Sequence, residues 1–220
     1  AIADGQRRLI WLAPSRDESN SGPILTPEVV EIWAATDASQ PDDEAVLPQV
    51  QGGRERGLIL HKMLEEVLTG EVQDDLASLT DRARMLIVAI GKPVADDPAK
   101  GLTPSELAGC VTRTLALPEI VELRPTLAPE FPVYASTVVD DVEQATAGIT
   151  DATSFGPDGK PQVVIDWKSD VQPTPETINH YRAQVANYLD VTGTKRGLIV
   201  LVTSGEILTV MPSPINAAAV

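Results

Sequence analysis

Two alternating runs joined by a tight turn, within residues 147–168, place the strictest limit on how this chain folds. Successive side chains of a strand point to opposite faces of its sheet, and the run 161–168 puts three apolar side chains on one face. Asp166 and Lys168 lie on the opposite face, at the end of the strand. The first run carries Asp151, and the Gly-Pro-Asp-Gly sequence between the runs fits a turn with proline second and glycine fourth. The pattern predicts a hairpin that can bring Asp151 close to Asp166.

Two carboxylates and one amine at the end of a strand pair suit a divalent cation and a phosphate. Mg²⁺ commonly binds through one or two carboxylates together with oxygens of a substrate phosphate. Lys168 lies two residues after Asp166 on the same face, where its charge can stabilise a phosphorane-like state or orient the attacking water. Asp-x-Lys is also a common ion pair at strand ends, so the tripeptide by itself indicates structure more often than chemistry.

A helix is predicted after this strand, from Thr174 to about Val191, with Gly193 as its stop. Gln184 and Tyr188 are four residues apart and therefore share one face of that helix. They could hydrogen-bond the lysine, a phosphate or a base. Without the preceding motif, they would be interpreted as a polar pair at a contact between helix and sheet.

Three amphipathic helices are predicted before the hairpin. The first covers 54–69, the second covers 79–90, and the third begins with a capping box at 103–106 and ends at Pro118. His61 lies on or beside the apolar stripe of the first helix. A lone histidine there is more often a core residue, but the downstream carboxylates favour a metal-ligand role for His61. Its nitrogen would suit Mn²⁺ as well as Mg²⁺.

Short strands are predicted from the remaining apolar runs, at 121–124, 130–134, 197–202 and 207–210. Together with the helices they define an α/β chain, in which a central mixed β-sheet is flanked by helices. The carboxylates and the lysine would then lie at one edge of that sheet.

Several motifs occur here together and in a fixed order, and the combination resembles the RecB-type nucleases of the restriction-endonuclease-like superfamily, which carries the PD-(D/E)xK signature. The resemblance covers about residues 54–210. Trp167 stands where tyrosine is more usual in that family, and Ser169 stands where threonine is common. The matching segments are Gly57-x-x-x-His61-x-x-x-Glu65, Gly148-x-x-Asp151, Asp166-Trp167-Lys168 and Gln184-x-x-x-Tyr188.

This resemblance implies a restriction-endonuclease-like core and a metal site within it. Lys168 would position or activate the attacking water, while Gln184 and Tyr188 would organise the pocket. Glu130 lies where the family often has a glutamate near the site. The implied ligands of Mg²⁺, or of Mn²⁺, are His61, Asp151, Asp166 and the main-chain carbonyl of Trp167.

The resemblance also implies an activity and its partners. RecB-type domains are DNA nucleases, often exonucleases, at the C-terminus of bacterial helicase–nucleases that process double-strand breaks for repair and recombination. The expected partners are DNA, with a single-stranded end favoured, and a helicase motor in cis or on a partner subunit. The sequence has no Walker A motif, so ATP hydrolysis would belong to that motor.

The chain divides into three predicted parts. Residues 1–53 are expected to be a linker and packing segment from a preceding module, with a short strand near 7–12 and a helix at 26–33. Residues 54–210 form the nuclease domain. Residues 211–220 are expected to be a loose tail.

Composition limits the functions that this domain could carry out unaided. The net charge is −15 with a pI near 4.4, whereas phosphate contacts usually need a basic surface. A partner would therefore have to supply the positive track for DNA. The single cysteine, Cys110, excludes a disulfide framework or a multi-cysteine metal site and suits the cytoplasm. No apolar run approaches the roughly 20 residues of a membrane span, so no membrane partner is expected.

Two alternatives of other classes remain open at this stage. One is a nuclease-like domain that has lost activity and serves as a DNA-strand guide or an assembly surface for a partner subunit. The other is an acidic domain that binds a divalent ion structurally and never meets nucleic acid. Mg²⁺-dependent cleavage of DNA, and its dependence on Asp166, would separate the three.

Overall fold

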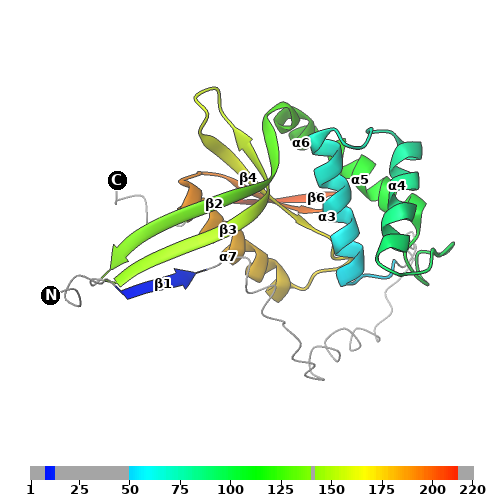
Figure 1. Ribbon diagram of the computed structural model, residues 1–220, viewed down its shortest axis with the longest axis horizontal. Coiled ribbons are helices and arrows are strands. Elements are labelled where there is room, and N and C mark those ends of the chain that lie inside the picture. Colours follow the sequence, from blue (N-terminus) through cyan, green and yellow to red (C-terminus); the bar gives the residue numbers. More distant parts are fainter. Residues whose placement is uncertain (1–7, 13–49, 140–141, 213–220) are drawn as a thin grey trace, which may run out of the picture.

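The computed structural model describes residues 8–12, 50–139 and 142–212. The chain is an α/β protein with an open, mixed β-sheet and helices packed on it (Figure 1), which confirms the predicted class of a central mixed sheet flanked by helices. The helix predicted at 26–33 lies outside the described residues. The described helices are α3 (Arg54–Thr69), α4 (Leu76–Ala89), α5 (Pro104–Leu115), α6 (Pro118–Leu123) and α7 (Pro175–Thr192). The strands are β1 (Arg8–Leu12), β2 (Leu127–Val139), β3 (Val142–Phe155), β4 (Pro161–Lys168), β5 (Gly197–Leu201) and β6 (Glu206–Val210).

The sheet order is β1-β3-β4-β5-β6, and β2 pairs with β3. The pairs β1/β3 and β4/β5 are parallel, whereas β2/β3, β3/β4 and β5/β6 are antiparallel. Because β2 runs along one edge of β3, both β1 and β4 must use the other edge, β1 at residues 142–146 and β4 at residues 152–155. Among the described strands, β3 therefore has no partner on that edge between these two stretches.

Helices cover both faces of the central strands. One apolar cluster joins α3, α4, α5 and α6 to the face of β4 that carries Val163, Ile165 and Trp167. A second cluster joins α7 to the opposite face, which includes Val164 of β4. All five residues of β5 are buried, as expected for a strand covered on both faces. The alternation predicted for 161–168 is thus confirmed.

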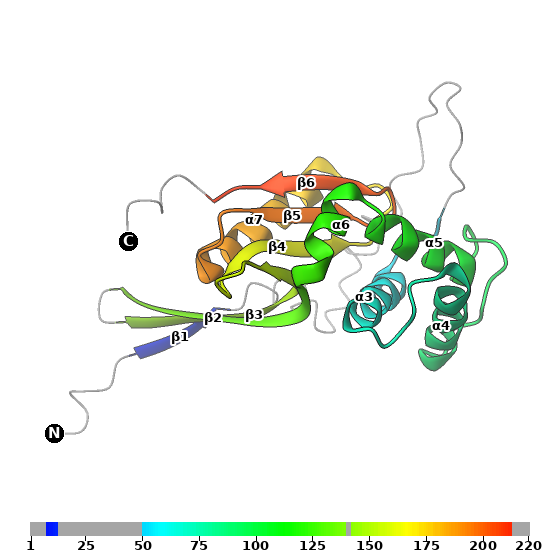
Figure 2. The same cartoon turned by 90° about the horizontal axis from the view of Figure 1, so that it is seen from above.

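The two views show how the layers are arranged. The β2–β3 hairpin reaches away from α3, α4 and α5, and β1 lies beside it (Figure 1). Strands β4, β5 and β6 lie side by side, and α3, α4 and α5 gather at one end of the molecule (Figure 2). The β3–β4 turn at 156–159 forms as predicted, and Gly159 there has a φ of 73°, which glycine adopts without steric penalty.

Two local predictions were wrong. The segment 121–124 was expected to be a strand, but it continues α6 into a 3₁₀ turn at Arg124–Thr126. Pro118 begins that helix, and the adjacent residues Val121 and Glu122 are both exposed, so burial in this segment does not follow a strand's alternation. The capping box at 103–106 does not form, because the Thr103 side chain makes no cap hydrogen bond and the side chain of Glu106 binds Arg56 instead.

The other predicted helices and strands of the described part are present. Helix α3 ends at Thr69 with Gly70 as its cap, α4 spans most of the predicted 79–90, and α7 begins after a Thr174 cap whose hydroxyl accepts the Thr177 N–H. Among the described helices, none combines the length and the apolar character needed to cross a membrane.

Candidate active site

The candidate site forms where β4 separates from β3. Their ladder ends at the pair Ala152 and Ile165, and the next residues in register would be Asp151 and Asp166. Beyond this point β4 pairs only with β5 among the described strands, so the N–H of Trp167 needs another acceptor. The carboxylate of Asp151 supplies it, with 2.6 Å between Trp167 N and Asp151 Oδ2. The backbone geometry therefore holds Asp151 in place.

Helix α3 brings an imidazole to the same carboxylate. The distance from His61 Nδ1 to Asp151 Oδ1 is 3.4 Å, and the two side chains are 33% and 18% exposed. His61 is thus not sealed in the core, although the helix that carries it is well packed. The predicted convergence of His61 with Asp151, from opposite halves of the chain, is present in the structure.

Lys168 and Asp166 are the most enclosed charges at the site, with side chains that are 7% and 6% exposed. The Nζ of Lys168 lies 3.2 Å from Asp166 Oδ2 and donates to Gln184 Oε1 at 2.9 Å. The ammonium also lies 4.4 Å from the ring centroid of Tyr181, a cation–π distance. Two oxygens and an aromatic face therefore compensate the amine for the hydration that it loses on burial.

The charges shift the proton affinities of His61 and Asp151 in opposite directions. Burial disfavours the imidazolium of His61, but the carboxylates of Asp151 and Asp166 outweigh burial and the opposing charge of Lys168, and they raise the pKa of His61 to about 9. Burial likewise opposes ionisation of Asp151, yet His61, Lys168 and the Trp167 N–H lower its pKa below the ordinary value. Without a metal, the pair is therefore an imidazolium and a carboxylate at neutral pH.

The two residues predicted on α7 have different roles. Gln184 contacts the lysine, as the sequence suggested. Tyr188 instead donates from its hydroxyl to the main-chain oxygen of Ile149 at 2.8 Å, in the stretch of β3 between the regions paired with β1 and β4. It therefore holds the strand that carries Asp151.

Tyr181 is a residue of this site that the motifs did not predict. Its ring faces Lys168, and its hydroxyl donates to Asp170 Oδ2 at 2.7 Å. The available signal was its position three residues before Gln184 on the same helix, which places both on one face. The motif directs attention to Gln184 and Tyr188, whereas the lysine lies between Gln184 and Tyr181.

Glu130 lies beside the site on the edge strand β2. It is the one non-glycine residue of the described chain with a positive φ, 49°. In the β2–β3 register it lies opposite Asp151, but these two residues do not form a ladder pair. Partial burial raises the pKa of Glu130, and the carboxylates of Asp151 and Glu65 raise it further. Its side chain is thus within electrostatic reach of Asp151.

The donor set fits a hard divalent cation only in part. Within the described residues, no group of three or more His, Cys, Asp and Glu side chains is arranged to hold a metal ion. His61 Nδ1 and Asp151 Oδ1 are 3.4 Å apart, close to the roughly 3 Å between neighbouring ligands that each lie about 2.1 Å from octahedral Mg²⁺. Asp166 is paired with Lys168 and would have to turn to complete the set.

The fourth implied ligand, the carbonyl of Trp167, has a suitable direction. The N–H and the C=O of one strand residue point to the same side of the strand. Because the N–H of Trp167 points to Asp151, its carbonyl also faces the gap between β3 and β4. The gap therefore combines an imidazole, the Asp151 carboxylate and a main-chain oxygen, which are ligand types found for Mg²⁺ and Mn²⁺.

Among known proteins, similarity to this chain is found only with solved structures. No protein-family model matches the chain, and no curated protein matches it. Among solved structures, 28 chains match. One of them, "Crystal structure of SSO0001", shares 20% sequence identity with a TM-score of 0.36, over 73% of this chain and 80% of that chain. A likeness at this level assigns neither a family nor an activity.

Proposed function

We propose that this chain is a RecB-type, metal-dependent DNA nuclease domain that hydrolyses phosphodiesters. The observation that carries the proposal is the placement of two neighbouring pairs at the end of β4, His61 with Asp151 and Asp166 with Lys168, close enough that Asp166 and Lys168 act electrostatically on His61. Three separate elements contribute these side chains, and the resemblance of the sequence motifs assigned the same side chains to one site. An ordinary strand-end ion pair would need only Asp166 and Lys168.

Each side chain has a role that its contacts support. His61, Asp151, Asp166 and the carbonyl of Trp167 would hold Mg²⁺ or Mn²⁺, which when bound polarises the phosphate and lowers the pKa of a water. Asp166 would exchange its contact with Lys168 for one with the metal.

Lys168 would act mainly through its charge. Gln184 and the ring of Tyr181 hold the ammonium form, so we assign Lys168 to stabilising the pentavalent state and orienting the water. Tyr188 would keep β3, and with it Asp151, at the correct distance.

The charge of the chain supports a role within a larger enzyme. A protein with a net charge of −15 repels DNA at long range, so capture of the strand would fall to a helicase motor in cis or on a partner subunit. We therefore propose a cytoplasmic helicase–nuclease that processes double-strand ends for repair and recombination, with the single-stranded end entering this site as an exonuclease substrate.

The test is cleavage of end-labelled single- and double-stranded DNA by the chain, with Mg²⁺ or Mn²⁺ and with EDTA as the metal-free control. We expect weak, metal-dependent cleavage that Asp166→Ala reduces at least about a hundredfold, since loss of even an outer-sphere partner costs 10–100-fold. Asp190→Ala, an exposed carboxylate on α7, is the matched control and should retain activity.

Other outcomes point to other functions. Cleavage that persists in Asp166→Ala would exclude this site as its source. Metal binding without cleavage, even when the chain is joined to a motor, would favour a structural ion site. DNA binding without cleavage in the joined protein would favour an inactive strand guide or assembly surface.

A further inference from the structure

Arg56 lies on α3, five residues before His61, and its guanidinium is buried with only 1% exposed. Nη1 donates to the main-chain oxygen of Ser169 and to Thr203 Oγ1, each at 2.8 Å. Nη2 donates to Glu106 Oε1 at 2.6 Å. One side chain therefore joins α3 to α5, to the turn between β5 and β6, and to the residue that directly follows Lys168.

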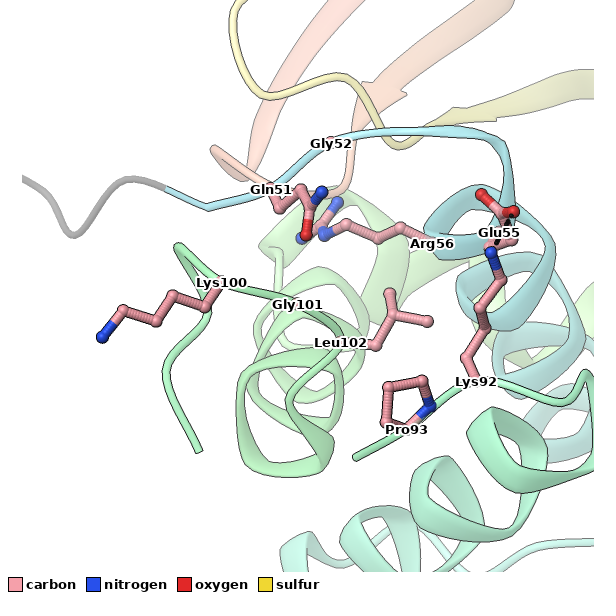
Figure 3. A pocket seen from close by; sticks show the side chains of 9 residues that line it. All are labelled: Gln51, Gly52, Glu55, Arg56, Lys92, Pro93, Lys100, Gly101 and Leu102. Atoms are coloured by element: carbon pink, nitrogen blue, oxygen red, sulfur yellow. Dashed lines mark ion pairs between the residues drawn. The ribbon is translucent and has the colours of Figure 1, made fainter. Parts of the chain in front are cut away.

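Further contacts reinforce this junction. Thr203 Oγ1 donates to the same Ser169 oxygen at 2.9 Å, and Cys110 lies 3.3 Å from Arg56 Nη2. A buried guanidinium is tolerated only when paired and hydrogen-bonded, so the surroundings fix its position closely. Figure 3 shows Arg56 extending from α3 beside Gln51, on the wall of a cavity of about 190 Å³.

The next residue, Gly57, allows the helix to come close to the strand end. A Cβ at this position would lie 2.9 Å from Ser169 Oγ and 3.8 Å from Ser169 Cβ. The backbone of α3 thus packs directly against Ser169, and a side chain at this position would press on the Ser169 hydroxyl. The hydrogen bonds of Arg56 hold α3 against the end of β4, and the lack of a side chain at Gly57 allows the helix backbone to come close to Ser169.

We propose that Arg56, Gly57, Ser169 and Thr203, here called the α3 dock, position the imidazole of His61 for metal binding. The proposal rests on the function proposed above. A helix rises about 1.5 Å per residue, so His61 is roughly 7 Å from the dock on the same rigid element. Ser169 is bonded directly to Lys168, so the dock also contacts the strand end that carries Asp166 and Lys168. The dock therefore fixes the distance between His61 on α3 and these two residues on β4.

The largest effect follows from the contact at Gly57. An added Cβ has to gain about 0.5 Å from Ser169 Oγ, from 2.9 Å to an ordinary contact of about 3.4 Å, and α3 moves by about 0.5 Å to the extent that the serine side chain does not rotate away. The same displacement at His61 would lengthen its 3.4 Å contact with Asp151 to nearly 4 Å, beyond hydrogen-bond range. Misplaced ligands of this kind weaken metal binding by about 10–100-fold.

The experiment compares Gly57→Ala with the double variant Gly57→Ala/Ser169→Ala, in which the 2.9 Å contact disappears and the 3.8 Å contact remains. All variants carry His180→Asn, so that one-dimensional NMR shows His61 as the single imidazole. Mn²⁺ affinity is measured by paramagnetic broadening of that signal. We expect at least tenfold weaker binding in Gly57→Ala and recovery to within about threefold in the double variant. Gly109→Ala, a helix position with open space around its Cβ, should bind as the parent does.

The His61 signal without metal, at a fixed pH, provides an independent readout. It should shift in Gly57→Ala and return in the double variant. If the parent binds no Mn²⁺, the proposed metal site fails, yet this shift and its return would still support the dock. Unchanged affinity and signal in Gly57→Ala, or no recovery in the double variant, would overturn it.

A milder variant covers the case in which Gly57→Ala does not fold. Thr203→Val keeps the volume and removes the hydroxyl that accepts from Arg56 and donates to Ser169. It should weaken Mn²⁺ binding two- to threefold while thermal unfolding remains cooperative. Parent-like affinity in this variant would contradict the dock.

Discussion

The metal-free chain is expected to lose stability as the pH rises from about 6.5 to 9, because of His61. Its pKa is about 9 in the folded chain against an ordinary 6.5, so the folded state holds a proton that the unfolded state has released within this range. A group whose pKa is raised by folding stabilises fully below the unfolded pKa, and that contribution is lost as the pH approaches the folded pKa. Asp151→Asn removes the main cause of the shift and should flatten the dependence.

The magnitude follows from the pKa and the exposure. A rise from 6.5 to about 9 corresponds to an upper limit of about 3 kcal/mol, at about 1.4 kcal/mol for each tenfold change in proton affinity. His61 is 33% exposed, so solvent screens its interaction with Asp151, and about 1–2 kcal/mol is expected. Burial and Glu106 raise the pKa of Cys110 from its ordinary value of 9 to about 11. Above pH 9 this thiol also lowers the stability of the fold, so the measurement ends at pH 9.

Urea unfolding at pH 6 and pH 9, for the parent and for Asp151→Asn, measures this difference. An NMR titration of His61 in the His180→Asn background gives its pKa directly. Equal pH dependence in the parent and in Asp151→Asn, or a His61 pKa near 6.5 in the parent, would refute the proposed pairing. Added Mn²⁺ should compete with the proton, so that metal affinity rises with pH up to about 9.

Two further predictions concern the packing around the site. Arg82→Ala removes the bidentate partner of Glu66, a side chain that is 2% exposed and lies 3.9 Å from the next cation, Lys62. Urea unfolding should show that the free energy of unfolding falls by about 2–4 kcal/mol. A fall of less than about 1 kcal/mol would contradict this prediction. Gly197→Ala places a Cβ 2.3 Å from Val185 Cγ1, so the free energy of unfolding should fall by about 1–3 kcal/mol. Parent-like stability of Gly197→Ala would show that α7 can move away from β5.

Several elements could be predicted from local sequence because local physics determines them. The alternation at 161–168 specifies a strand with two different faces, the 156–159 turn requires glycine and proline at set positions, and the periodicity of α3 places His61 beside its apolar stripe. Each signal lies within a few residues, and tertiary packing agrees with it. The motif order then indicated which distant side chains belong together.

Other features depend on neighbours that are far away in the sequence. The segment 121–124 looks like a strand, but burial of Ile120 against the helical cluster favours a helical turn. Glu106 occupies a capping position in the sequence, but its carboxylate accepts a hydrogen bond from Arg56 instead. Tyr181 has no motif, and its position over Lys168 results from how α7 packs on β4.

By itself, the sequence determined the helices and strands that carry the chemistry and the identity of most of the reactive groups, since propensity, periodicity and turns act over short distances. Only the tertiary structure decided which of those groups touch. Because β4 separates from β3, the Trp167 N–H donates to the carboxylate of Asp151. The packing of α3 brings His61 to the same carboxylate. These contacts depend on ångström-scale distances between separate elements, and such distances follow from packing rather than from any local pattern.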